Sequence, residues 1–250
     1  MTTDPTTFRQ AATDLTWLTE RPIAHRGWHG EGRGPENSLA SFEAAAEAGF
    51  AIECDVHPTI DGKVVVFHDD TLDRLTGATG PVRSRRADEL RGISLTGSNE
   101  RIPAFDEMLD VVGGRVPIVV ELKGFGPRQE GFVPALVETL GSYRGPIAFM
   151  SFDHSLVRAL SREAPAHVRG LTAEGLGEAS HTKHADLADD VHFVSYAVDH
   201  LPNPFVERFR ATGRPVITWT VRTPEQIATT RRHADQMTFE EFDPRSVGIE

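Results

Sequence analysis

Short apolar runs rich in valine and isoleucine alternate with helix-like stretches along almost the whole chain, and this alternation constrains the fold most strongly. The runs have the length and the β-branched content of buried strands. They are residues 22–27, 51–56, 64–69, 116–123, 146–152, 167–172, 192–198, 215–221 and 236–241. Strands that alternate with helices favour parallel strands joined by helical crossovers.

Helical patterns occupy most of the intervals between these runs. Several open with Asn, Asp or Thr and close with Gly or a basic residue, as helix ends prefer. The predicted helical stretches are residues 37–49, 102–114, 131–142, 153–164, 203–213 and 223–233.

The third apolar run lies too close to the second for a parallel crossover. Only residues 57–63 separate them, whereas a parallel connection needs about a dozen residues or more. The Asp61-Gly62 pair is typical of a hairpin turn. We therefore predict a TIM (β/α)8 barrel with an extra β-hairpin strand after strand 2. We expect residues 1–250 to form one domain, in which residues 1–20 supply a short helix that closes the barrel bottom.

Acidic side chains recur on two predicted neighbouring strands. Glu53 and Asp55 alternate with apolar residues, and Glu121 shares a face with Lys123. If the apolar faces meet the helices, the charged faces gather in the barrel mouth. A salt bridge to Lys123 would explain one buried acid, but three carboxylates at one place favour a hard divalent cation. Zinc fits less well, because it prefers nitrogen and sulfur ligands.

Two histidines end apolar runs and can exchange protons near neutral pH. They are His25 and His68, and the hairpin predicts that His68 lies roughly opposite Asp55. Arg26 offers a planar guanidinium for phosphate oxygens. His57 is expected at most to line the mouth.

Other side chains are expected to play structural parts. Cys54 should pack between the sheet and the helices as a small hydrophobe. Ile217, Trp219 and Val221 should share one face of their strand. His181 and His184 have helical spacing, but no neighbouring carboxylate pattern supports a metal site. We expect them on a solvated helix or loop.

Charge and cysteine content exclude several classes of function. The formal net charge is -11, which argues against binding nucleic acid or anionic lipid surfaces. A single cysteine excludes an intrachain disulfide and a cysteine-rich zinc site. No signal peptide or transmembrane segment is expected. The expected compartment is therefore the cytoplasm, and the sequence sets no oligomeric state.

The chain resembles the glycerophosphodiester phosphodiesterase family through a series of motifs between about residues 22 and 244. The motifs follow in the family's order: HRG (25–27), PEN (35–37), ECD (53–55), HDDTLDRLTG (68–77), IPAFDEML (102–109), ELK (121–123), SF (151–152), WTV (219–221) and ADQMTFE (234–240). The last motif departs from the family, which usually has Thr-Asp where this chain has Thr238-Phe239-Glu240.

The resemblance implies an oval TIM barrel whose bound cation, Mg²⁺ or Ca²⁺, is held at the positions of Glu53, Asp55 and Glu121. It also implies that His25 and His68 are the acid–base pair. The remaining implied site residues are Arg26 and Lys123 on the phosphate oxygens, Trp219 as an apolar wall for the glycerol or alcohol part, and Glu36 and Asn37 as supporting residues.

The implied activity is that of a phosphoric diester hydrolase which converts glycerophosphodiesters to glycerol 3-phosphate and an alcohol. In the family, the substrate's own 2-hydroxyl is thought to attack phosphorus, and water then opens the cyclic phosphate. Related possibilities are a lysophospholipase D and a lyase that stops at the cyclic product. A catalytically silent barrel that binds a phosphorylated ligand is the alternative of another class. The complete set of histidines and acids argues against it.

Overall fold

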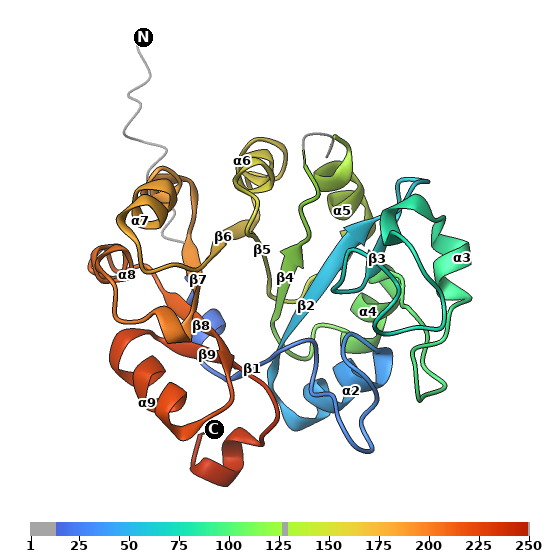
Figure 1. Cartoon of the computed structure of the whole chain (residues 1–250), viewed down its shortest axis with the longest axis horizontal. Coiled ribbons are helices and arrows are strands. Elements are labelled where there is room, and N and C mark those ends of the chain that lie inside the picture. Colours follow the sequence, from blue (N-terminus) through green and yellow to red (C-terminus); the bar gives the residue numbers. More distant parts are fainter. Residues whose placement is uncertain (1–13, 127–129, 250) are drawn as a thin grey trace.

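Strands of one sheet close into a barrel in the computed structural model, which describes residues 14–126 and 130–249 (Figure 1). Within those ranges the strands are β1 (Ile23–Ala24), β2 (Ala51–Pro58), β3 (Val64–Val66), β4 (Ile118–Leu122), β5 (Ile147–Ser151), β6 (Val168–Ala173), β7 (Phe193–Ala197), β8 (Val216–Val221) and β9 (Gln236–Phe239). Strand β1 pairs in parallel with both β2 and β9, which closes the barrel. Among the strands of the described ranges, β3 pairs with β2 alone and is antiparallel to it. The predicted (β/α)8 barrel with an extra hairpin strand is confirmed.

Helices surround the barrel at the positions that the sequence predicts, with additions (Figure 1). The described helices are α1 (Thr16–Thr19), α2 (Leu39–Ala48), α3 (Ala87–Arg91), α4 (Phe105–Val112), α5 (Phe132–Leu140), α6 (His154–Glu163), α7 (Glu178–Ala185), α8 (Pro204–Arg210) and α9 (Pro224–His233). All six predicted helices are present, while α3 and α7 lay outside the prediction. None of the helices in the described ranges combines the length and the apolar content that a membrane-spanning helix needs.

Local sequence explains where these helices begin and end. The Ser38 and Ser41 side chains form a reciprocal capping box at the start of α2, and Gly49 ends the helix with a φ of 80°. Helices α8 and α9 begin with a proline after a capping Asn203 or Thr223. The capping box starts α2 directly after the loop that carries His25, Arg26, Glu36 and Asn37.

The hairpin turns at Gly62, whose φ is 73°. Its strands are in the register Val56 to Val66, so the backbone N–H of Phe67 donates to the carbonyl of Asp55 at 2.9 Å. The prediction that His68 lies roughly opposite Asp55 therefore holds to within one residue, because the turn closes between Thr59 and Lys63. His68 follows directly after the residue that faces Asp55.

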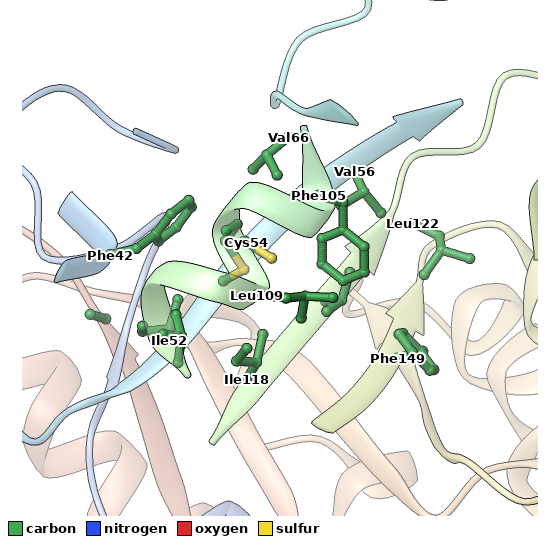
Figure 2. Packing of buried hydrophobic residues seen from close by; sticks show 14 of the residues in the cluster. Phe42, Ile52, Cys54, Val56, Val66, Phe105, Leu109, Ile118, Leu122 and Phe149 are labelled. Carbon is green, nitrogen blue, oxygen red and sulfur yellow. The ribbon is translucent and has the colours of Figure 1, made fainter. Parts of the chain in front are cut away.

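The outer faces of β2 and β4 pack against α2 and α4 (Figure 2). Cys54 is fully buried there between Ile52 and Val56, and it contacts the same apolar cluster as Phe105 and Leu109. The predicted packing role of Cys54 is confirmed. Because successive strand residues face opposite sides, Glu53 and Asp55 must point into the barrel.

A second apolar cluster fills the amino end of the barrel. Leu18 of α1 is 1% exposed and packs with Ile23, Val119 and Ile217. Helix α1 thus closes the barrel bottom, as expected. The part of that expectation that concerns residues 1–13 lies outside the described residues.

The structure contradicts two expectations about side-chain orientation. His181 and His184 lie on α7 but are 8% and 7% exposed, and His184 packs against Tyr196 and Phe205. They are buried rather than solvated, because α7 uses them in place of an apolar stripe. Val221 does not share the inward face of Ile217. It packs in the outer cluster, since the β8–β9 pairing shifts register between Thr218 and Val221.

Candidate active site

A cavity of about 460 Å³ opens at the carboxyl ends of the barrel strands. Eight of the ten predicted site residues line it: His25, Arg26, Glu53, Asp55, His68, Glu121, Lys123 and Trp219. Glu36 and Asn37 do not line it but contact residues that do. A wider hollow of about 1390 Å³ at the amino ends is lined by none of the ten. The cavity at the carboxyl ends is therefore the candidate active site.

Three buried carboxylates line this cavity together. Strands β2 and β4 pair so that Asp55 lies beside Glu121, and Glu53 is two residues earlier on the same face of β2. One oxygen from each lies within 4.8 Å of the others. In the described ranges no other group of three or more His, Cys, Asp or Glu side chains meets this spacing. We call these residues the acidic triad.

Asp55 is the most heavily contacted member of the triad. Nζ of Lys123 lies 2.7 Å from its Oδ1, and Nε of Arg26 lies 3.5 Å from its Oδ2. The Asn37 amide donates to the same Oδ2 at 2.8 Å. Burial opposes ionisation of Asp55, but Lys123, His68 and Arg26 outweigh it and lower its pKa. Asp55 is thus held as a carboxylate in a fixed orientation.

Glu53 and Glu121 are less well compensated. Burial raises the pKa of both, and the charge of Asp55 raises them further. Glu121 contacts Lys123, whereas Glu53 accepts only the backbone N–H of Arg26, at 2.9 Å. Among the described residues no side-chain cation pairs with Glu53.

The triad fits a hard divalent cation. It offers three oxygen ligands within a small space, and such ions prefer oxygen. When all three carboxylates are ionised, they carry one negative charge more than Arg26 and Lys123 supply. A divalent ion would convert this excess to a positive charge, which suits an anionic substrate. Lys123, which now contacts Asp55 and Glu121, would then share those carboxylates with the ion.

His25 lies at the end of β1, on the wall formed by β1 and β9. Burial lowers its pKa, which favours the neutral ring. Its Nδ1 lies 3.4 Å from Oε2 of Glu240, and the other oxygen of Glu240 lies 3.1 Å from Nε2 of His29. Arg222 also contacts Glu240. Glu240 was not among the predicted site residues, although the departure from Thr-Asp in the last motif marked this position.

His68 lines the same cavity and is held by a chain of contacts between polar and charged side chains. Its Nδ1 is 2.7 Å from Oδ1 of Asp69, whose carboxylate also accepts two hydrogen bonds from Arg74. These contacts, led by the one from Arg74, lower the pKa of Asp69 to about 2. Arg74 bonds Glu36, which in turn bonds Arg26 at 2.7 Å. Arg74 was also missed, and it connects His68 to the proposed phosphate-binding arginine.

His57 does not line the cavity. It is 1% exposed, and its Nε2 lies 3.2 Å from the backbone carbonyl of His68. Burial lowers its pKa to about 4, so the ring is neutral at physiological pH. His57 therefore supports the hairpin that carries His68 instead of taking part in the site.

Two aromatic side chains also line this cavity. The rings of Phe152 and Trp219 meet edge to face with centroids 5.3 Å apart. The indole N–H of Trp219 donates to the carbonyl of Ser195 at 3.2 Å, which fixes the ring. Phe152 is 41% exposed at the rim. These rings offer an apolar surface to a substrate held at the triad.

Comparisons with known proteins agree on one family. The model of the glycerophosphoryl diester phosphodiesterase family matches residues 25–237. A glycerophosphodiester phosphodiesterase of Caldanaerobacter subterraneus is 31% identical over 216 residues, which cover 82% of this chain and 87% of that protein. Another, from Bacillus altitudinis, is 28% identical over 236 residues, with 90% and 86% covered.

Solved structures give the same answer for the fold. An Oleispira antarctica phosphodiesterase in complex with the product sn-glycerol-3-phosphate superposes with a TM-score of 0.79. It is 25% identical in sequence, and the match covers 89% of this chain and 93% of that one. A glycerophosphodiester phosphodiesterase from Thermotoga maritima superposes with a TM-score of 0.69 at 26% identity, covering 87% and 92%.

Proposed function

This chain belongs to the glycerophosphoryl diester phosphodiesterase family, and we propose that it hydrolyses glycerophosphodiesters to glycerol 3-phosphate and an alcohol with the help of a divalent cation. Family membership makes it a phosphoric diester hydrolase. One observation carries the finer proposal: a single cavity combines a buried acidic triad, two histidines and two cationic side chains. The product bound to the Oleispira antarctica relative supports the same substrate class.

Glu53, Asp55 and Glu121 would hold Mg²⁺ or Ca²⁺. The ion, when bound, supplies positive charge to the non-bridging phosphate oxygens. Arg26 and Lys123 line the same cavity and would bind further phosphate oxygens. Asn37 would orient Asp55 through the hydrogen bonds between them, and Glu36 would orient Arg26. A charged phosphodiester is thereby held despite the negative charge of the whole protein.

His25 and His68 would move the protons. One ring accepts a proton from the attacking hydroxyl, and the other donates a proton to the departing alkoxide. Attack by the substrate's own glycerol 2-hydroxyl gives the advantage of an intramolecular reaction. Trp219 would support the glycerol or alcohol part from the cavity wall. We propose that residues 1–250 form a single domain and that this domain carries the one active site.

A lysophospholipid is a second substrate candidate. Phe152 is partly exposed at the rim and packs on Trp219, so an acyl-bearing glycerol has an apolar surface to contact. A lysophospholipase D would use the same acids and histidines. The two substrate candidates differ only in whether an acyl ester replaces a free hydroxyl of the glycerol.

The test is a substrate panel followed by ³¹P NMR. The purified chain with Mg²⁺ or Ca²⁺ is incubated with glycerophosphocholine, glycerophosphoethanolamine, glycerophosphoglycerol and lysophosphatidylcholine. We expect glycerol 3-phosphate from at least one glycerophosphodiester. Release of lysophosphatidic acid would indicate the lysophospholipase D activity, and accumulation of a cyclic phosphate would indicate a lyase. A folded chain that turns over no diester would contradict the proposal and favour a binding module.

A further inference from the structure

Glu240 contacts two histidines at once, directly after β9. Its Oε2 lies 3.4 Å from Nδ1 of His25, and its Oε1 lies 3.1 Å from Nε2 of His29. Arg222 contacts the same carboxylate. The Glu240 side chain is only 11% exposed, so its charge needs partners. These three side chains provide them.

The backbone holds Glu240 in place relative to His25. The N–H of His25 donates to the carbonyl of Phe239 at 3.0 Å, and the N–H of Glu240 donates to the carbonyl of Val221 at 3.0 Å. The loop after β9 is therefore hydrogen-bonded on both sides, to β1 and to β8. These backbone hydrogen bonds therefore place the Glu240 carboxylate beside the His25 imidazole independently of the contact between the two side chains.

A carboxylate at one ring nitrogen decides which tautomer a neutral histidine adopts. It favours the proton on the nitrogen it faces, which leaves the other nitrogen free to accept a proton. Nδ1 of His25 is buried and makes no hydrogen bond of good geometry with any described group. Its 3.4 Å separation from Glu240 is an ion-pair distance, and such contacts often tighten only when substrate binds.

We propose that Glu240 is the positioning residue of His25: it holds Nδ1–H and so presents Nε2 to the substrate. His29 and Arg222 keep the carboxylate in place. This inference rests on the proposed catalytic role of His25. The competing explanation is structural, namely that Glu240 only ties the loop after β9 to its neighbours through Arg222 and His29.

The experiment compares Glu240→Gln with the wild type on glycerophosphocholine. The amide keeps the shape of the side chain but not the charge. We expect kcat to fall by about 10- to 1000-fold while KM changes less than about threefold. Glu240→Asp should restore part of kcat. The matched control is Glu241→Gln, which removes the same charge from an exposed neighbour that also faces Arg222 and should leave kcat within about twofold.

A double variant separates positioning from a structural role. If Glu240 acts through His25, Glu240→Gln should cost nothing further in the His25→Ala background, because the two residues work as a unit. The same fold loss in both backgrounds would overturn the proposal.

A second readout does not depend on turnover. In ¹⁵N-histidine NMR spectra, with His25 assigned from the His25→Ala variant, we expect the Nδ1–H tautomer in the wild type and a shift toward the Nε2–H tautomer in Glu240→Gln. An unchanged tautomer would refute the role of Glu240. A chain with no activity but with this tautomer change would refute the proposed function alone.

Discussion

Lys123 forms an ion pair with Asp55 across two neighbouring barrel strands, with Nζ 2.7 Å from Oδ1. The same ammonium contacts Glu121. One cation therefore serves two of the three acids, and Glu53 is left without a side-chain counter-charge among the described residues. This imbalance is the electrostatic basis of the proposed metal site.

Replacement of Lys123 should separate metal binding from catalysis. Lys123→Met removes a positive charge, so the acidic triad should bind a divalent cation more tightly, while the phosphate loses a contact. We expect kcat/KM for glycerophosphocholine to fall by about 100-fold or more. Calorimetric metal titration and steady-state kinetics measure the two effects. Lys183→Met, on the exposed face of α7, is the charge-matched control. Full activity in Lys123→Met would contradict the assignment.

Asn37 should affect metal affinity through Asp55. Its amide donates to Oδ2 of Asp55 at 2.8 Å, and its φ is 54°. Asn37→Ala should weaken metal binding by about 10- to 100-fold, as is usual when a ligand loses its supporting hydrogen bond. Asn37→Gly removes the amide but relieves the left-handed backbone. If glycine behaves like alanine, the hydrogen bond matters. If glycine restores affinity, the backbone conformation was the cause and the assigned role of the amide is wrong.

The strands, most helices and the acidic triad could be predicted because their signals are local. β-branched content and two-residue alternation mark β2 and β4 in the sequence, and parallel pairing then brings Asp55 beside Glu121. The hairpin followed from loop length and the Asp61-Gly62 turn. Its register could not be set to the residue, because that depends on where the turn closes.

The contacts of Glu240 and the orientation of α7 could not be predicted from local signals. Glu240 and His29 are 211 residues apart, and their meeting depends on closure of the barrel between β1 and β9. Helix α7 carries no apolar stripe in its sequence. Its buried face is identified only by tertiary contacts, such as the packing of His184 on Tyr196. Val221 lies on the face opposite to the predicted one, because the β8–β9 pairing shifts register there, and the periodicity of the sequence does not indicate this shift.

The outer core should respond strongly to loss of volume. Leu109 of α4 is 4% exposed and packs over β2 and β4 (Figure 2). Leu109→Ala should lower the free energy of unfolding by about 2–5 kcal/mol, because the site loses apolar contacts and keeps a cavity. Leu176→Ala is the matched control, since that leucine is 64% exposed and should cost less than about 0.5 kcal/mol. Denaturant unfolding measures both, and equal losses would contradict the packing described.

His184 should make stability depend on pH. Burial lowers its pKa to about 4, whereas an unfolded histidine titrates near 6.5. The unfolded chain therefore binds a proton that the folded chain refuses as pH falls from about 6.5 to 4, and stability is lost over that window. The loss from this group should be about 1–3 kcal/mol. His184→Leu should flatten the slope of unfolding free energy between pH 6.5 and 4.5. An unchanged slope would show that His184 is not the source.

The most direct test of the account is the metal dependence of glycerol 3-phosphate release from glycerophosphocholine. The chain is stripped with a chelator, assayed, and assayed again after Mg²⁺ or Ca²⁺ is restored, with Glu53→Gln in parallel. We predict that activity disappears in chelator, returns with the ion, and does not return in Glu53→Gln. Undiminished release in the chelator would contradict the central claim that the acidic triad holds a required cation.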